Sequence, residues 1–355
     1  MALKIVRTEQ PKKKPLESGL DFGTRFTDHM FNMDYSPKEG WHNARIEPYG
    51  PIMMDPASMV LHYGQAVFDG LKAYRTQKGS IQLFRPRDNF TRLNISAGML
   101  CIPEIDPEFV LSTLKELLIL ERDWVPSLAG TSLYIRPTIV AMDPYLGVRP
   151  SQTYRFFIIL SPVGAYYPEG FNPVKIWITD KYVRTVRGGL GMAKTPANYA
   201  ASLYAAEVAK EKGYTQVLWL DGVERQYIEE VGTMNIFFRI NDTLVTPPLQ
   251  GSILAGITRD SIIKLAQYWH IPMEERPITI HEVMSAHDKG MLQEVFGSGT
   301  AAVISPVNAL AWGDRIITIQ DGDVGPMAKR FYNEITAIQY GEAEDPLGWV
   351  MSIED

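Results

Sequence analysis

The order of its strand-like and helix-like segments limits the folds open to this chain. Runs rich in β-branched and aromatic residues, typical of strands, follow one another: they are SLYIRPTIVA (132–141), YRFFIILSPV (154–163), VKIWITD (174–180) and TQVLWLD (215–221). Segments with helical periodicity occur at 108–124, 197–213 and 257–269. A doubly wound parallel sheet requires strict alternation of strands and helices, which this order lacks. We therefore predict an α+β fold whose sheets are largely antiparallel or mixed.

The chain is too long for one ordinary hydrophobic core. It has 355 residues, whereas single cores stop growing at about 250–300 residues. Residues 164–173 (GAYYPEGFNP) hold two glycines and two prolines, interrupt the periodicity and predict a linker. We predict a smaller N-terminal α+β domain over 1–163 and a larger C-terminal domain over 174–355.

Charge and cysteine content exclude several classes of function. A net charge of −6 provides no basic field for a phosphate backbone, so nucleic acid is not expected as a partner. A single cysteine, Cys101, cannot form an internal disulfide and fits a reducing compartment. No apolar run approaches the ~20 residues of a membrane span, and the N-terminal residues lack the apolar segment of a secretory signal. We expect a cytoplasmic protein with no membrane partner.

One lysine stands where its chemistry could be used. Lys194 follows a glycine-rich approach, VRGGLGMA (186–193), and precedes Pro196, which opens an alanine-rich helix. The positive end of a helix dipole and partial burial both favour the uncharged, nucleophilic form of an amine. The placement suits a lysine that forms a Schiff base with an aldehyde, and a solvated surface lysine is the plain alternative.

The same segment also resembles a phosphate-binding loop. Residues 188–195 (GGLGMAKT) match G-x-x-x-x-G-K-[ST] except at Ala193, whose Cβ would crowd an approaching phosphate. Pro196 removes a backbone N–H from a helix start that should donate such groups. A P-loop nucleotide hydrolase is therefore the less favoured of the two enzymatic interpretations.

Three other segments offer polar groups to a bound ion. Glu230 is expected in a turn just before an apolar strand, where it faces either a cationic partner or solvent. The backbone N–H groups of Ile257 and Thr258 open an amphipathic helix, which is either an anion site or an ordinary capped end. Residues 296–307 (FGSGTAAVISPV) place Thr300 in a glycine-rich turn whose amides could bind an anion.

These segments occur together in the order seen in one enzyme family. The most specific are LHYGQAVFDGLKAY (61–74), LFRPRDNFTRL (83–93), GTSLYIRPTIVA (130–141), AKTPANY (193–199), QVLWLDG (216–222), EEVGTMNIF (229–237) and EVFGSGTAAVISPV (294–307). Over nearly its whole length the chain resembles the branched-chain amino acid aminotransferases, pyridoxal 5′-phosphate (PLP) enzymes of fold type IV. The resemblance implies reversible amino transfer between leucine, isoleucine or valine and 2-oxoglutarate in a ping-pong cycle. It also implies a homodimer whose active site is completed by the partner chain.

The resemblance assigns residues to the cofactor. Lys194, in the C-terminal domain, would bond covalently to PLP and later carry the proton, Glu230 would bind the pyridine nitrogen, and Arg92 would bind the phosphate. A protonated ring nitrogen paired with a carboxylate deepens the electron sink that PLP provides. The remaining cofactor contacts that the resemblance implies come from Tyr199, Thr233, Ile257, Thr258 and Thr300.

The resemblance also assigns residues to the substrate. Amides of Thr300, Ala301 and Ala302 would take the substrate carboxylate. The rest of the pocket would be formed by Tyr63, Tyr134, Arg136, Phe22, Phe68 and Tyr166, and by Leu146 and Val148 of the neighbouring subunit. Such a pocket favours aliphatic side chains, since burial of each CH₂ contributes ~0.8 kcal/mol. The polar tips of the two tyrosines and the arginine would receive the side-chain carboxylate of glutamate.

The sequence departs from the family in two places. Pro196 and Ala197 stand where many members have two glycines, which predicts a stiffer entry to the helix. Ala302 and Ser305 occupy the region where some animal members carry a redox-active cysteine pair, so thiol regulation is not expected there. The six histidines show no metal-ligand spacing, and no metal is expected. A D-amino-acid aminotransferase or a PLP-dependent lyase of the same fold is the alternative activity.

Overall fold

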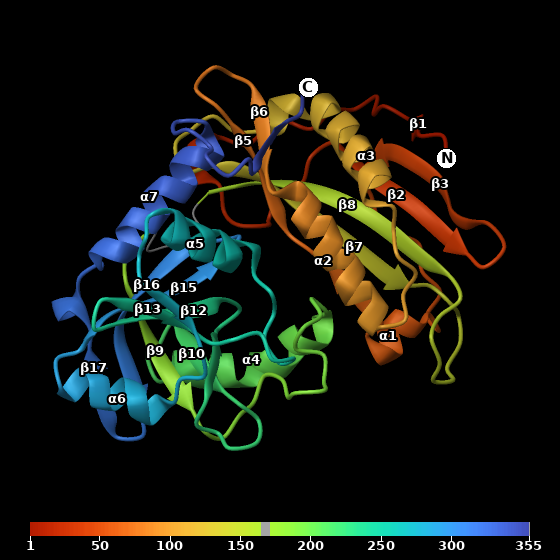
Figure 1. The fold of residues 1–355 in the computed structure, drawn as a ribbon. Coiled ribbons are helices and arrows are strands. Elements are labelled where there is room, and N and C mark those ends of the chain that lie inside the picture. The colour runs from red at the N-terminus through yellow and green to blue at the C-terminus, as the bar shows by residue number, and fades with distance from the viewer. Residues whose placement is uncertain (165–170, 355) are drawn as a thin grey trace. The chain divides into compact units, whose positions relative to one another are not determined.

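The computed structural model describes residues 1–164 and 171–354, which form two units (Figure 1). Unit 1 comprises Met1–Tyr166, Ala193–Pro196 and Ala337–Asp355, and unit 2 comprises Tyr167–Met192 and Ala197–Thr336. The predicted linker falls largely on residues outside the described ranges. The units differ from the predicted domains because two stretches of 174–355 belong to unit 1, which is also the longer unit.

Unit 1 is built on a sheet that, counted over its described residues, has nine strands in the order β1-β3-β2-β8-β7-β5-β6-β18, with β4 paired to β7. Only the β1–β3 pair is parallel among them. The longest pair, β7 (Ser132–Ala141) and β8 (Tyr154–Val163), has the bounds that the sequence predicts. The others are β1 (Lys4–Ile5), β2 (His29–Ser36), β3 (Gly40–Pro48), β4 (Ala66–Phe68), β5 (Leu71–Arg75), β6 (Ile81–Phe84) and β18 (Val350–Ser352).

Two helices, α2 (Pro86–Met99) and α3 (Pro107–Leu120), cover one face of this sheet (Figure 1). Each begins with a proline at a position where no N–H is needed, and the carboxylate of Asp106 caps α3. Their apolar side chains form a core with alternate residues of the strands, including Leu133 and Ile135 of β7. Because successive side chains of a strand point to opposite faces, the residues next to these in β7 lie on the other face. A short helix, α1 (Met59–Tyr63), completes the helices of this N-terminal part.

Unit 2 has a mixed sheet of nine strands within the part of the chain that the structure describes. Its order is β11-β10-β9-β16-β15-β12-β13-β14, with β17 paired to β16. A bridge between Val231 and Met234 joins the end of β11 to the start of β12, so the sheet curves back toward its own first strand. The strands are β9 (Val174–Thr179), β10 (Gln216–Leu220), β11 (Ile228–Val231), β12 (Asn235–Ile240), β13 (Thr243–Thr246), β14 (Met273–Glu275), β15 (Leu292–Gly299), β16 (Val303–Trp312) and β17 (Arg315–Thr318).

The helices of unit 2 pack through small or apolar faces. In α4 (Pro196–Glu211), Ala205 and Ala209 are one turn apart and pack against Trp219 of β10, a close approach that larger side chains would prevent. The remaining helices are α5 (Ile257–Tyr268), α6 (Ile280–Asp288) and α7 (Pro326–Tyr340), whose last residues belong to unit 1. Antiparallel and mixed sheets with helices confirm the predicted α+β class. Over residues 1–164 and 171–354, no helix is both long and apolar enough to cross a membrane.

Candidate functional site

The main chain around Lys194 is held by unit 1. The N–H of Lys194 donates to the hydroxyl of Ser96 in α2 at 2.9 Å, and its carbonyl accepts from the N–H of Phe68 in β4 at 3.0 Å. The hydroxyl of Thr195 donates to the carbonyl of Ala66 at 2.8 Å. With the backbone fixed at both ends, the half-buried side chain places its Nζ 5.2 Å from the centre of the Phe68 ring.

A buried ion pair lies close to this amine. Arg92 of α2 bonds Asp69 twice, from Nε at 2.9 Å and from Nη2 at 2.7 Å, and the Asn89 amide adds a third bond at 2.8 Å. Burial alone would raise the pKa of the Asp69 carboxyl, but the charges of Arg92 and Lys194 hold it below its ordinary value. Asp69 therefore stays ionised and fixes the plane of the Arg92 guanidinium.

Four of the predicted substrate residues form an aromatic and cationic cluster in unit 1. Arg136 donates from Nη2 to the Tyr134 hydroxyl at 2.9 Å, and its guanidinium lies 4.7 Å from the Phe68 ring centre. Phe22 packs edge-on against Tyr134, with ring centres 4.9 Å apart. Because Phe68 also contacts Lys194, the structure brings this cluster and the predicted reactive amine together.

The tyrosine of this cluster rests on a glycine. A Cβ added at Gly70 would lie 2.0 Å from the Tyr134 hydroxyl oxygen, so only glycine leaves room for that oxygen. Lys72 is paired with Tyr134 in the β5–β7 ladder and is almost completely buried, which lowers its pKa to about 8. The sequence analysis did not single out Lys72 or Asp69. The signal was present, since both are charged residues within the apolar run AVFDGLKAY (66–74).

The other predicted substrate residues of unit 1 lie at its surface. The Tyr63 hydroxyl donates to the carbonyl of Leu146. Leu146 and Val148 are 63% and 85% exposed, unusually high values for such apolar side chains. Tyr166, predicted as a pocket wall, lies outside the described residues.

In unit 2, Glu230 is buried in a strand and not in the expected turn. It lies in β11, pairs with Trp219 of β10, and is followed by the turn that contains Thr233. Nη1 of Arg184 lies 2.8 Å from its carboxylate, and both side chains are almost fully buried. The sequence analysis missed Arg184, because its partner lies far along the chain. This pairing compensates for the removal of both charges from water.

Asn235 connects Glu230 to the start of α5. Its amide donates to the Glu230 carboxylate at 3.4 Å and to the carbonyl of Leu254 at 2.9 Å. Its carbonyl oxygen lies so close to Gly256, the residue before α5, that an added Cβ would be 1.9 Å away. The first residues of α5, Ile257 and Thr258, thus begin beside the Glu230 carboxylate.

The glycine-rich turn adjoins the same asparagine. Ser298, in β15, is the ladder partner of Asn235, and its buried hydroxyl has no hydrogen-bond partner among the described residues. Thr300, Ala301 and Ala302 form the following turn into β16. Unit 2 therefore gathers the predicted residues Glu230, Thr233, Ile257, Thr258 and Thr300–Ala302 around Asn235. Tyr199 is half-buried in the first turn of α4. Among the described residues, no cluster of His, Cys, Asp and Glu could hold a metal.

Comparison with known proteins gives consistent matches. Residues 66–310 match the family model of the class IV amino-transferases. Branched-chain-amino-acid aminotransferase 2 of Bacillus subtilis (strain 168) is 55% identical and aligns over 99% of this chain and 97% of its own length. Branched-chain-amino-acid transaminase 1 of the same organism is 52% identical, with 98% of each chain covered.

Solved structures agree in fold. The Escherichia coli branched-chain amino acid aminotransferase superposes with a TM-score of 0.76 at 28% identity, over 92% of this chain and 99% of that one. The T.th. enzyme with pyridoxamine 5′-phosphate superposes with a TM-score of 0.77 at 27% identity, over 93% and 100%. The chain therefore belongs to the branched-chain amino acid aminotransferases, a PLP-dependent family within the class IV aminotransferases.

Proposed function

We propose that this chain carries out its family's reaction with Lys194 as the reactive amine. The chain is a PLP-dependent branched-chain amino acid transaminase, and its substrates are amino acids and 2-oxo acids. The D-amino-acid aminotransferase, lyase and P-loop alternatives are not favoured, because the high identity over nearly the full length is to branched-chain enzymes. The assignment of Lys194 rests on its fixed main chain and on its position near Phe68 and the Asp69–Arg92 pair.

The residues present fit PLP. Lys194 is an amine that can bond to an aldehyde, and Arg92 is a guanidinium that suits a phosphate. Glu230 is a buried carboxylate of the kind that pairs with a protonated ring nitrogen. The start of α5 has no side-chain cap among the described residues, so its backbone amides suit an anion. The buried hydroxyl of Ser298 has no hydrogen-bond partner in the same part of the chain, and a ligand could satisfy it.

We propose the following roles for the chain's own groups. When bound, PLP supplies an electron sink for bond changes at the substrate α-carbon. Lys194 would hold it covalently and then act as the base that moves the α-proton. Glu230, whose carboxylate lies beside Arg184, would keep the ring nitrogen protonated. The remaining contacts proposed are Tyr199 and Thr233 toward the ring, and Arg92, Ile257, Thr258 and Thr300 toward the phosphate.

Substrate selection would rest on the cluster of Phe22, Phe68, Tyr134 and Arg136. Its rings offer an apolar surface to a branched side chain. The Nε of Arg136 is buried and has no hydrogen-bond partner within the described chain, so a distal carboxylate of glutamate or 2-oxoglutarate would satisfy it. One surface could thus accept both kinds of substrate. The amides of Thr300–Ala302, together with Tyr63, would take the α-carboxylate.

The finer proposals concern assembly and location. We propose a homodimer in which Leu146 and Val148 of one chain complete the pocket of the other, supported by the exposure of these two apolar residues. Tyr166 is proposed as a further wall of the pocket. A cytoplasmic location stays a prediction from the sequence.

Replacing Lys194 with alanine tests the assignment. We expect turnover of L-leucine with 2-oxoglutarate to fall by at least roughly 10²–10⁴-fold, the usual contribution of a positioned base. Borohydride treatment should leave cofactor attached to the denatured wild-type chain but not to the variant. Lys210→Ala, at an exposed lysine of α4, is the matched control and should keep both properties. Turnover at the wild-type rate in Lys194→Ala would overturn the proposal.

A further inference from the structure

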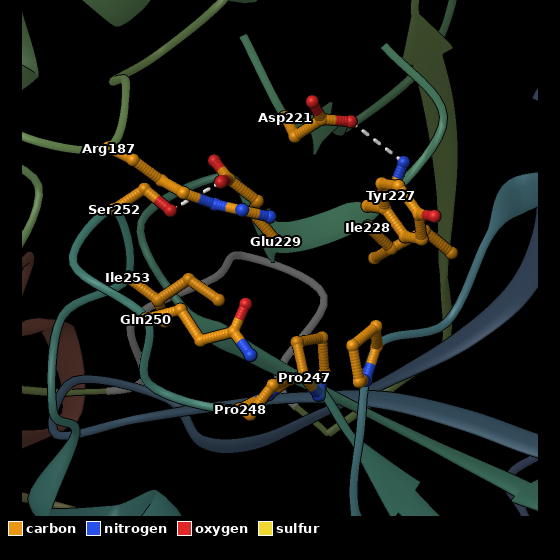
Figure 2. Close-up of a pocket in the computed structure, with 11 residues that line it drawn as sticks. Arg187, Asp221, Tyr227, Ile228, Glu229, Pro247, Pro248, Gln250, Ser252 and Ile253 are labelled. Atoms are coloured by element: carbon orange, nitrogen blue, oxygen red, sulfur yellow. Dashed lines mark hydrogen bonds between the residues drawn. The ribbon is translucent and has the colours of Figure 1, made fainter. Parts of the chain in front are cut away.

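Unit 2 contains a pocket whose lining includes none of the residues proposed for the cofactor or the substrate (Figure 2). It is small and partly open to solvent, so a ligand would lie against its walls with one side in water. Its walls come from Arg187, before Lys194 in the chain, from Tyr227–Glu229 at β11, from the segment 247–253 after β13, and from Pro277. The lining combines charged and apolar groups, which is typical of a small-molecule site.

The pocket has one buried acidic group that can take a ligand. Glu229 is 6% exposed, and its Oε1 accepts a hydrogen bond from the hydroxyl of Ser252, which leaves Oε2 for another donor. Burial raises the pKa of this carboxyl, and the hydrogen bond from Ser252 and the charge of Arg187 act against burial. Asp221 also lines the pocket, but each of its oxygens already accepts two backbone N–H groups. Asp221 is therefore structural.

The pocket also contains a positively charged side chain, Arg187, and a side-chain amide, Gln250. Figure 2 shows the Arg187 side chain reaching toward Glu229, while Gln250 lies on the opposite side of the pocket. Within the described part of the chain, neither side chain makes a hydrogen bond or an ion pair. The Arg187 guanidinium and the Glu229 carboxylate approach each other but form no direct salt bridge, so a ligand with both charges could bind to the two of them.

The remaining wall is apolar and rigid. Pro247 and Pro277 have no N–H groups and few conformations to lose, and Ile228 and Ile253 add aliphatic surface beside them. Such a wall suits an aliphatic group, which gains free energy for each CH₂ that it removes from water. A cation, an anion and an aliphatic surface side by side are complementary to a zwitterion with an apolar side chain.

We propose that this pocket binds a free α-amino acid with an apolar side chain, with the α-carboxylate on Arg187, the α-ammonium on Oε2 of Glu229 and the side chain on the proline-lined wall. A carboxylic acid without the amine would use only the arginine. An amine without the carboxylate would use only the glutamate. The pocket therefore selects the complete amino acid.

The position of the pocket connects it to groups used in the reaction. Glu229 is the neighbour of Glu230 in β11, and the two side chains point to opposite faces. The carbonyl of Ser252 accepts from the hydroxyl of Thr185 at 2.8 Å, and a Cβ at Gly191 would lie 2.2 Å from the same oxygen. An occupant would thus contact both the strand of Glu230 and the segment that leads to Lys194.

Calorimetric titration of the borohydride-reduced holoenzyme with L-leucine tests the proposal. Reduction stops exchange at Lys194, so each binding event is reversible. We expect an event whose affinity falls at least tenfold in Arg187→Met and in Glu229→Gln. 4-Methylvalerate, which lacks the ammonium, and leucinamide, which lacks the carboxylate, should each bind at least tenfold more weakly in that event. Glu207→Gln, at an exposed glutamate of the same unit, is the matched control and should bind as wild type does.

The outcomes separate this site from the reaction itself. Transaminase turnover, measured on the same preparations, reports on Lys194 and not on the pocket. Thermal unfolding identifies a variant that has lost its fold, and Glu229→Gln keeps an acceptor for Ser252. If every binding event in wild type is unchanged in both folded variants, or if leucinamide and 4-methylvalerate bind as tightly as L-leucine, the proposal is wrong.

Discussion

Gly70 sets the position of a residue proposed to bind substrate. Its missing side chain makes room for the Tyr134 hydroxyl, which in turn accepts from Arg136. We expect Gly70→Ala to displace Tyr134 and to raise the KM for 2-oxoglutarate by about tenfold, equivalent to ~1.4 kcal/mol. Steady-state kinetics with leucine and 2-oxoglutarate will measure this change.

A second glycine gives the control. Gly98 lies in α2, and a Cβ there meets nothing within 4 Å. Gly98→Ala should therefore keep wild-type kinetics and gain about 0.5–1 kcal/mol of stability from its higher helix propensity. Equal KM values in the two variants would show that Tyr134 does not depend on Gly70.

Burial of Lys72 is expected to lower the stability of the folded protein. Burial lowers its pKa from 10.5 to about 8, so at neutral pH the folded protein holds a charge away from water. Replacing Lys72 with methionine should raise the free energy of unfolding at pH 7 by about 2–3 kcal/mol. The gain should shrink as the pH rises from 8 toward 10.5, because over that range the native lysine is already neutral while the unfolded one is still charged.

Urea denaturation at pH 7 and pH 10 will measure this difference. Lys78→Met, at an exposed lysine of the same unit, should show no comparable gain. A gain in Lys72→Met that is equal at both pH values would assign the effect to packing and not to charge.

At this scale the sequence supplied residue types but not their partners. Lys194 could be proposed from its local sequence, and the resemblance to a family added Phe68, Tyr134 and Arg136; unit 1 places the four together. The apolar run around Asp69 marked that aspartate as unusual, but the partners of Asp69 and Arg184 could not be predicted, because each pairs with a residue distant in the chain. Such pairs become visible only when the fold brings two charges into a low-dielectric interior.

At the scale of elements, the start of α7 depends on one carboxylate. Glu294 of β15 accepts from the N–H groups of Met327 and Ala328 at 3.0–3.1 Å, and from Arg239 at 3.1 Å. Replacing it with glutamine keeps an acceptor but removes the charge that favours a helix N-terminus. We expect Glu294→Gln to cost about 1–2 kcal/mol.

Hydrogen exchange will locate this loss. Protection should fall first in the opening turn of α7, while the sheet of unit 1 keeps its protection. Uniform loss of protection over both units would mean that Glu294 supports the whole fold and not the helix end alone. Glu334→Gln, on the same helix, is a control that leaves the N-terminal turn unchanged.

Strands were easier to predict than turns. The runs 132–141 and 154–163 give β7 and β8 with their bounds, because each run of β-branched and aromatic residues follows a threonine and is followed by turn-forming residues, Asp143–Pro144 in one case and Gly164 in the other. Glu230 was expected in a turn and lies in β11. Its neighbour Glu229 is also acidic, and two adjacent acidic residues are not typical of a strand. Both are nevertheless buried, one on each face of β11, which the sequence does not indicate.

At the scale of the whole molecule, acid should unfold the protein through a few aspartates. The pKa values of four aspartates, Asp34, Asp69, Asp143 and Asp221, lie below the ordinary value. Burial alone would raise them, but hydrogen bonds and nearby arginines outweigh that effect. Carboxyls of this kind contribute stability above the unfolded pKa of about 3.9, and that contribution is lost as the pH falls toward the folded values. The Tm should therefore drop steeply below about pH 4.

Asp221→Asn will test this at the strongest of these sites. The variant should have a lower Tm at pH 7 and a flatter dependence between pH 5 and pH 3. Burial raises the pKa values of Glu121 and Glu229 above their ordinary range, so these two groups act in the opposite direction as the pH falls. An unchanged slope in Asp221→Asn would assign acid unfolding to other groups.

The fold class and the family could be predicted for the whole chain, whereas the division into units could not. The order of segments was sufficient to predict the fold class and the family, because seven motifs occur in this sequence in the order seen in that family. The division depends on contacts of Ala193–Pro196 and Ala337–Asp355 with strands and helices that are distant in the chain. Such contacts cannot be predicted from local composition.

The assignment of Ala193–Pro196 to unit 1 limits how the protein could be produced as two separate fragments. The segment has unit 2 on both sides of it along the chain, so no single cut yields a fragment that contains unit 1 complete with its amine. A fragment ending before residue 165 would lack Lys194, and a fragment starting there would carry it without Ser96 and Phe68. Complementation by two separately expressed halves would have to rebuild those two hydrogen bonds before the amine could be held in place.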